Sequence, residues 1–314
     1  MGTKDSVLAA LAAAAALTLS ATIPAAADGL PGAIEIPCAA DVLQQSVDWF
    51  VPDGPARGLI WLQHGFARTH ANVAELAQTF ADAGHLVFVP SLPFMNLSGC
   101  TLQSLGDNTA FLNNVAALLS GDRAGALRAS LAAALGPDRE IPAIPEQFVF
   151  VGHSAGAEAV EYVAYRMQAS APRVWAGLRG LVLLDPVRSF LGDNTDRALA
   201  ALDPTGLPIL AVSSPPSWCN TFGTGTDALQ RHLHRPFVGV RLADGAHTDA
   251  EGNSSDPVGE SLCGTPRPAN VATLHRLVLG WIGDFFAGTT TPDYYPTTAG
   301  TIPAAPEVQI LHGA

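Results

Sequence analysis

Ten residues, 147–156, constrain the fold of this chain more than any other stretch. They read Gln-Phe-Val-Phe-Val-Gly-His-Ser-Ala-Gly, an apolar run typical of a buried strand followed directly by a Gly-x-Ser-x-Gly turn. Residues 155–169, which come next, are alanine-rich and typical of a helix. A strand, a tight turn and a helix in this order lift a serine hydroxyl out of a sheet, where a histidine can reach it. The stretch therefore predicts a nucleophile elbow at Ser154; the alternative is a surface serine in a glycine turn.

The first 27 residues have the pattern of a secretory signal peptide. An apolar run over residues 7–17 is followed by Pro24-Ala-Ala-Ala27, and the expected mature chain begins at Asp28. The run is shorter than the ~20 apolar residues that span a bilayer, so a transmembrane helix is the weaker alternative. We expect a secreted protein, and its richness in Ala, Gly, Pro and Arg favours a bacterial source. Association with the cell wall is a further option.

Four cysteines lie in the expected mature chain, an even number that favours two disulfides in an exported protein. They are Cys38, Cys100, Cys219 and Cys263. Their wide spacing contains no Cys-x-x-Cys pair, so zinc and redox motifs are not indicated. Four cysteines allow three pairings, and proximity along the chain favours Cys38 with Cys100 and Cys219 with Cys263.

The charged residues exclude several classes of function. The only lysine, Lys4, leaves with the signal peptide, which removes lysine Schiff bases, Ser-Lys dyads and P-loop lysines. The remaining 15 arginines are scattered among 27 acidic residues. Nucleic acids and anionic membranes favour clustered positive charge, so neither is an expected partner. We expect no metal and no organic cofactor.

Short apolar runs alternate with helical segments along the mature chain. Strands are predicted at residues 47–51, 58–64, 85–90, 147–152, 180–185, 207–213 and 237–242. No strand is expected after residue 242. Helices are predicted at residues 71–83, 105–134 with a break near Gly121, 155–169 and 270–286. Such apolar strands between helices indicate an α/β fold: a mostly parallel, doubly wound sheet flanked by helices. Only about 21 residues separate Asp185 from the next strand, and fewer than 30 separate that strand from the last one, so no large lid domain is expected.

The mature chain reads as one catalytic domain, residues 28–287, followed by a tail. Residues 288–314 are rich in Thr, Pro and Ala, which predicts a poorly ordered extension or a wall-spanning linker. No second domain is expected. The one roomy insertion is residues 90–146, and its first part, residues 91–97, is expected to lie over the site.

An acid and a histidine follow Ser154 at predicted strand ends. Asp185 ends the apolar run 181–184, and the alternative for it is a turn-capping role. His247 follows the last predicted strand by a short loop. Because a doubly wound sheet gathers functional groups at the carboxyl ends of its strands, we expect a triad of Ser154, Asp185 and His247.

Other acids and histidines are weaker candidates. The segment after the next strand, residues 213–220, offers no carboxylate. Two acids close to His247 in sequence replace Asp185 if that residue proves structural: Asp244 and Asp249. Surface or packing roles are expected for the histidines in helical segments: His232, His234 and His275. His153, inside the elbow, is expected to pack or to face the substrate rather than to act as the base.

In such a triad the histidine takes the proton of the serine, whose oxygen then attacks a carbonyl group. The negative charge that develops on the carbonyl oxygen needs two hydrogen-bond donors. One is the backbone N–H of Ala155, directly after the nucleophile. The other is expected from the loop after the strand at residues 58–64, where the sequence His64-Gly65-Phe66 brings the N–H of Phe66 near the site.

These motifs occur in the order in which α/β-hydrolases carry them, and the chain resembles that superfamily over nearly all of its mature length. Among the subfamilies, it resembles secreted bacterial lipases and cutinase-like esterases. The acid in Leu-Leu-Asp-Pro-Val also resembles that of chlorophyllases and platelet-activating-factor acetylhydrolases. Unlike many polyester hydrolases, the chain lacks an acid after the following strand and a second Gly after the elbow. The resemblance implies hydrolysis of carboxylic esters through an acyl-enzyme on Ser154.

Apolar side chains near the expected site predict an ester substrate with a hydrophobic acyl or alcohol part. The candidate walls are Phe66, Phe94, Met95, Val187, Phe190 and Trp218, each of which could equally belong to the core. A serine peptidase or amidase uses the same triad and is the first alternative. A non-catalytic binding protein on a hydrolase fold is the second.

Overall fold

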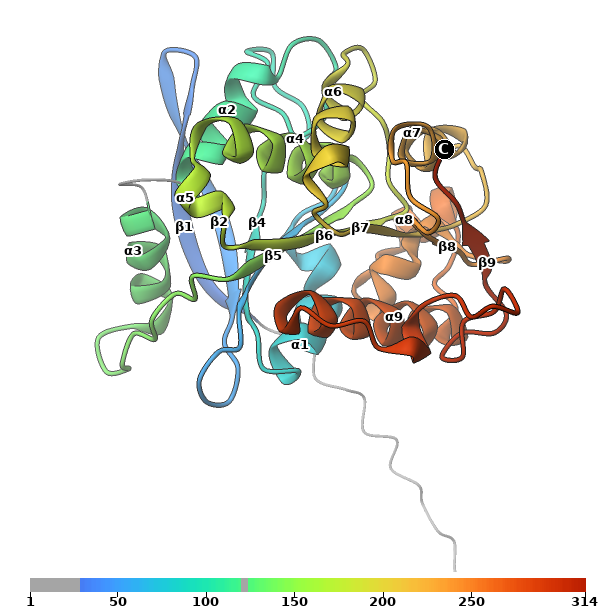
Figure 1. The fold of residues 1–314 in the computed structure, drawn as a ribbon. Coiled ribbons are helices and arrows are strands. Elements are labelled where there is room, and N and C mark those ends of the chain that lie inside the picture. Colours follow the sequence, from blue (N-terminus) through green and yellow to red (C-terminus); the bar gives the residue numbers. More distant parts are fainter. Residues whose placement is uncertain (1–28, 120–123) are drawn as a thin grey trace, which may run out of the picture.

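The computed structural model describes residues 29–119 and 124–314 (Figure 1). The expected signal peptide and the expected break near Gly121 lie outside the described residues. Within the described residues, one sheet has nine strands in the order β1-β2-β4-β3-β5-β6-β7-β8-β9. The strands are β1 Leu30–Cys38, β2 Asp41–Phe50, β3 Leu59–Gln63, β4 Leu86–Pro90, β5 Phe148–His153, β6 Leu178–Leu184, β7 Ile209–Ser213, β8 Gly239–Arg241 and β9 Gln309–Leu311.

The strands from β3 to β8 pair in parallel, while β1, β2 and β9 add antiparallel partners at the two edges. The chain passes from β3 to β4 on one side and then to β5 on the other side of β3. Ligands of doubly wound sheets bind where the strand order reverses in this way, at the carboxyl ends of the strands. The predicted fold class, a mostly parallel doubly wound sheet, is confirmed.

Helices cover both faces of the sheet (Figure 1). They are α1 Ala74–Asp82, α2 Thr109–Leu118, α3 Ala124–Leu135, α4 Ala155–Ser170, α5 Pro172–Trp175, α6 Asn194–Leu202, α7 Thr224–His232, α8 Pro257–Cys263 and α9 Pro268–Ala287. Alternate residues of β3 serve the two faces: Leu59 and Trp61 join the core with α2 and α4, whereas Ile60 and Leu62 join the core with α1 and α9. This double burial explains why the central strands are uniformly apolar in sequence.

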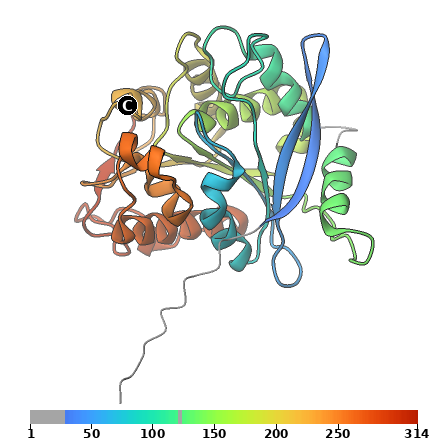
Figure 2. The same cartoon turned by 180° about the vertical axis from the view of Figure 1, so that it is seen from behind.

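The first two strands form a long hairpin that the sequence predicts only in part. The prediction covers residues 47–51, whereas β1 and β2 pair from Leu30 with Trp49 to Cys38 with Asp41. The missed strands alternate buried and exposed residues, as in buried Ile34 and Ile36 around exposed Glu35. They therefore lack the continuous apolar run that marks the central strands. Figure 2 shows α3 lying against this hairpin, where Trp49 Nε1 donates to Ser130 Oγ at 3.1 Å.

The predicted strand at residues 237–242 is present as β8, but the prediction that it is the last strand is wrong. Residues 309–311, in the segment expected as an extension, form β9 and pair antiparallel with β8. The same segment buries Ile302 and Ala305 against α9, and Trp281 Nε1 of α9 donates to the carbonyl oxygen of Tyr294. A few apolar residues anchor the segment to the sheet and to α9, although its Thr and Pro content is typical of a linker.

Two disulfides join distant segments in the pairing that chain proximity favours. Cys38, at the end of β1, bonds to Cys100 in the loop after β4, with Cα atoms 5.8 Å apart. Cys219, in the loop after β7, bonds to Cys263 at the end of α8, with Cα atoms 5.6 Å apart. Separately, none of the helices within residues 29–119 and 124–314 is both long and apolar enough to cross a bilayer.

Candidate active site

Ser154 lies on a strained turn between β5 and α4. Its φ of 55° and ψ of −123° are unfavourable for a residue with a Cβ. The flanking glycines make the turn possible. A Cβ on Gly152 would lie 2.5 Å from the carbonyl oxygen of Gly156, and one on Gly156 would lie 2.5 Å from the carbonyl oxygens of Gln63 and His64. The chain therefore folds here into the elbow geometry that the sequence predicts.

The predicted site residues gather at the carboxyl edge of the sheet, because each follows the end of a parallel strand. Gly65 follows β3, Ser154 follows β5, Asp185 follows β6, and His247 lies in the loop after β8. Ser154 and His247 line one cavity. Both are nearly buried, at 5% and 7% exposed, so water competes little for their polar atoms.

His247 and Asp185 are joined by a short hydrogen bond. The imidazole Nδ1 lies 2.6 Å from Oδ2 of Asp185, whose backbone has a positive φ of 41° directly after β6. Burial alone would raise the pKa of Asp185, but the hydrogen bond and charge of His247 and two donations from Ser214 hold it below its usual value. An ionised Asp185 fixes the hydrogen on Nδ1 and leaves Nε2 as the acceptor nitrogen of the ring.

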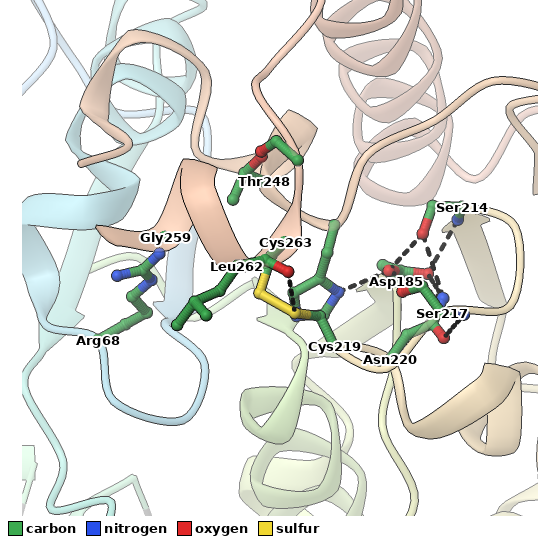
Figure 3. The surroundings of a disulfide bond; sticks show 12 residues. Arg68, Asp185, Ser214, Ser217, Cys219, Asn220, Thr248, Gly259, Leu262 and Cys263 are labelled. Carbon is green, nitrogen blue, oxygen red and sulfur yellow. Dashed lines mark hydrogen bonds and ion pairs between the residues drawn. A yellow bond between two sulfur atoms is a disulfide. The ribbon is translucent and has the colours of Figure 1, made fainter. Parts of the chain in front are cut away.

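Two further partners of Asp185, Ser214 and Asn220, come from the segment after β7, and the sequence does not predict a role for either residue. Ser214 donates its backbone N–H to Oδ1 at 2.8 Å and its hydroxyl to Oδ2 at 2.6 Å. Asn220 Nδ2 lies 3.2 Å from each carboxylate oxygen (Figure 3). Serine and asparagine are also common turn residues, so the sequence carries no signal of this role.

The alternative acids and histidines have other partners. Asp249 accepts from the backbone N–H groups of Ala246 and Arg267, both at 2.8 Å, and Asp244 pairs with Arg267. The surface histidines His232 and His234 contact Asp196 and Asp203, respectively. These contacts occupy both acids that the sequence leaves open as substitutes for Asp185.

His153 packs beneath the predicted base. Its ring lies 4.8 Å from the ring of His247, and its Nε2–H donates to the carbonyl oxygen of His247 at 3.0 Å. Burial and the nearby charge of His247 lower the pKa of His153 to about 3. A neutral His153 therefore supports the His247 loop, which agrees with the packing role expected from its place in the elbow.

The loop after β3 lies directly against the serine. A Cβ on Gly65 would lie 2.7 Å from Cβ of Ser154, so only glycine allows this approach. His64 is fully buried; burial lowers its pKa to about 4, and its Nδ1–H donates to the carbonyl oxygen of Gly65 at 2.8 Å. Phe66 lines the cavity. Ala155 is the first residue of α4, where backbone N–H groups have no partner within the helix.

Arg68 joins this loop to the chain beyond His247, a link that the sequence does not reveal. Its Nε donates to Glu251 Oε1 at 2.8 Å and its Nη1 donates to Asp256 Oδ2 at 2.7 Å. A Cβ on Gly259 of α8 would overlap the guanidinium, so a larger residue there would displace the Arg68 side chain. The pairs join residues more than 180 positions apart, which leaves no local pattern to recognise.

The cavity at Ser154 has a volume of about 640 Å³. Its large apolar lining residues are Phe66, Leu105, Val187, Phe190, Trp218, Phe222, Val258 and Leu262. Four of the predicted wall residues are among these, but the structure places neither Phe94 nor Met95 in the lining. The ring of Phe94 packs edge-on against Phe66 at 5.3 Å, and Met95 is 67% exposed to solvent.

A larger hollow, of about 830 Å³, lies at the opposite edge of the sheet. It is lined by Leu59 and Phe148, the first residues of β3 and β5, and by Arg128, Arg173 and Arg179. None of the predicted site residues borders it. Because ligands of such sheets bind at the carboxyl ends of strands, the smaller cavity is the candidate site.

Glu158, one turn after the elbow in α4, is a buried carboxyl group that the sequence analysis misses. It accepts from Ser104 N at 2.9 Å, Asn194 Nδ2 at 3.4 Å and Asn108 Nδ2 at 3.5 Å. Ser104 and Asn108 lie in the loop that leads into α2, and Asn194 begins α6 at the end of the loop after β6. These two loops also carry Leu105 and Val187 of the cavity wall. Glu158 therefore ties both loops to the nucleophile helix.

Burial raises the pKa of Glu158 from 4.5 to about 7, and its hydrogen bonds only partly oppose this. Between these pH values the unfolded chain binds fewer protons than the folded one, so this group makes stability fall as pH rises. We therefore compare the free energy of unfolding of Glu158→Gln with that of the wild type. This difference is expected to shift in favour of the variant as the pH rises from 4.5 to 7.5, by about 3 kcal/mol at most. Urea unfolding at both pH values measures the difference. The exposed Glu140→Gln is the control, and an equal difference at both pH values for Glu158→Gln would contradict the prediction.

No protein-family model and no curated protein matches the sequence, whereas solved structures resemble the fold of this chain. The chain is similar to the ferulic acid esterase from Streptomyces cinnamoneus, with a TM-score of 0.52, 16% identity, and coverage of 93% of this chain and 98% of that one. It is also similar to a fungal esterase from Rhizomucor miehei, with a TM-score of 0.50, 12% identity, and coverage of 83% and 85%. Together with the strand order, these likenesses show that the chain has the α/β-hydrolase fold.

Proposed function

We propose that this protein is a serine hydrolase that cleaves carboxylic esters. The observation that carries the proposal is the meeting of a serine on a strained elbow with a histidine bonded to a buried aspartate, at one cavity. Ser154 is the nucleophile, His247 the general base and Asp185 the acid that orients it. The esterase activities of the two structural neighbours agree with this assignment.

The reaction proceeds in two stages. His247 takes the hydroxyl proton of Ser154 as the serine oxygen attacks the ester carbonyl, and the backbone N–H groups of Phe66 and Ala155 stabilise the oxyanion. The tetrahedral intermediate collapses, the alcohol leaves with the proton held by His247, and an acyl-enzyme remains on Ser154. Water, activated by His247, then attacks the acyl-enzyme and releases the carboxylic acid.

The cavity favours an ester with a hydrophobic acyl or alcohol part, because apolar and aromatic side chains form most of its wall. Lipase-like, cutinase-like and polyester-cleaving activities are the finer possibilities within this class. We also propose that the protein is secreted, with residues 1–27 as the signal peptide. Two disulfides support this proposal, since such bonds persist in oxidising compartments.

Hydrolysis of p-nitrophenyl butyrate and p-nitrophenyl palmitate by residues 28–314 tests the proposal, with p-nitroanilides as the comparison. We expect both esters to be cleaved faster than the anilides, and the ratio of the two esters to separate esterase from lipase preference. Faster cleavage of anilides would support a serine peptidase instead. Absence of any hydrolysis, together with no labelling by a fluorophosphonate, would support a binding protein.

A further inference from the structure

Asn220 lies fully buried beside Asp185, in the loop after β7. Its neighbour Cys219 forms the disulfide with Cys263, and Figure 3 shows the side chain of Asn220 turned toward Asp185. We propose that Asn220 is a positioning residue whose side-chain amide holds the Asp185 carboxylate in the orientation that faces His247. The inference rests on the proposed function, because the orientation of Asp185 matters to catalysis only if His247 is the base.

The amide nitrogen of Asn220 reaches both oxygens of the acid. Nδ2 lies 3.2 Å from Oδ1 and 3.2 Å from Oδ2 of Asp185, and 2.9 Å from the carbonyl oxygen of Pro215. An amide has two N–H groups, so one can donate to the carboxylate while the other donates to this carbonyl. Nδ2 is thus fixed between the backbone and the acid.

A carboxylate needs such fixing because its terminal torsion is broad and nearly two-fold. Oδ2 of Asp185 serves both the His247 ring and the hydroxyl of Ser214, which can itself rotate. The backbone N–H of Ser214 holds only Oδ1. A donor equidistant from both oxygens resists rotation of the carboxylate plane, and a charge-assisted hydrogen bond also stabilises the ionised form of a buried acid.

The oxygen of the same side chain builds the loop that carries it. Oδ1 accepts from the backbone N–H of Ser217 at 2.8 Å and from that of Gly223 at 2.9 Å. Thr221 and Phe222 follow with positive φ values of 48° and 59°, which are unfavourable for residues with a Cβ and persist only in a well-held loop. The two ends of the amide therefore have separable roles: the oxygen fixes the loop, and the nitrogen faces the acid.

Asn220→Asp separates these roles. The introduced carboxyl keeps an oxygen for Ser217 and Gly223 but loses the N–H donors that face Asp185. At lower pH the two carboxyls share a proton, and the introduced O–H can donate as the amide does. At higher pH that proton is lost, and two like charges face each other beside His247.

We expect Asn220→Asp to lower kcat for p-nitrophenyl butyrate by roughly 10- to 100-fold at the pH optimum, the range for losing a hydrogen bond to a charged group, with KM little changed. The pH–rate profile should also acquire a decline on its alkaline side that the wild type lacks. A purely structural loss would scale activity at every pH without adding this limb. Asn114→Asp is the matched control, because its Nδ2 donates to the carbonyl oxygen of Pro37, away from the cavity, and wild-type activity is expected.

A double-mutant cycle keeps the inference testable if Asn220→Asp folds poorly. Asn220→Ala should lower kcat in the wild-type background but have little effect in an Asp185→Ala background, because its partner is already absent. Equal losses in both backgrounds, or a wild-type profile for folded Asn220→Asp, would overturn the positioning role while Ser154→Ala still abolishes hydrolysis. Absence of hydrolysis by the wild type would instead overturn the proposed function, and this inference with it.

Discussion

Ser154→Ala is expected to lower kcat for ester hydrolysis by roughly 10⁴-fold or more, as removal of the nucleophile does in serine hydrolases that use a triad. Alanine removes the hydroxyl oxygen that attacks the ester carbonyl in the proposed mechanism. The neighbouring residues Gly65 and Ala155 carry no nucleophilic side chain that could replace it. Water would then have to attack without a covalent intermediate.

Initial rates with p-nitrophenyl butyrate measure this loss, and stoichiometric labelling by a fluorophosphonate identifies the nucleophile independently. Ser170→Ala, at the other end of α4, is the matched control and should keep full rate and labelling. If Ser154→Ala kept its activity and its label, the nucleophile would lie elsewhere in the chain.

Asp185→Asn is expected to lower kcat by roughly 10³- to 10⁴-fold, near the effect of the same substitution in a well-studied triad. The reason is the donor set around this carboxylate. Its oxygens accept from His247, from two groups of Ser214 and from Asn220. An introduced amide offers only one acceptor oxygen, so its NH₂ group must face a donor. The imidazole of His247 would then turn or adopt the wrong tautomer.

The same ester assay tests this prediction, with circular dichroism to confirm that the variant folds. Asp244→Asn is the control, since this exposed acid near His247 in sequence pairs with Arg267 and should be dispensable. Near-normal rates for Asp185→Asn, with loss of activity in Asp249→Asn, would move the acid to Asp249.

Residues close together in sequence account for the features that could be predicted. The elbow is specified within ten residues, because the apolar run, the two glycines and the helix-forming segment each determine local backbone geometry. Asp185 is recognisable because it ends a continuous apolar run, and strands of that kind occur where helices cover both faces of a sheet. The predicted meeting of Ser154, Asp185 and His247 then follows from parallel strands ending at one edge.

Strands are missed where only one face of the strand is buried, or where the composition of the segment is typical of a linker. The β1–β2 hairpin exposes every second residue along much of its length, and β9 lies in a segment whose Thr and Pro content is typical of linkers. Phe94 and Met95 have the right chemistry for a cavity wall. The direction of a loop side chain, however, depends on its packing partner, and the ring of Phe94 packs against Phe66.

The amino-acid sequence by itself determined the fold class, the elbow and the strand-end positions of the acid and the histidine, because local backbone preferences and apolar runs specify them. Only the tertiary structure decided which groups surround those side chains. Asn220 meets Asp185 across 35 residues, Ser104 meets Glu158 across 54, and Arg68 meets Glu251 across 183. Hydrogen bonds of this kind depend on distances of a few ångströms between separate loops, and these distances exist only after the sheet has brought the loops together.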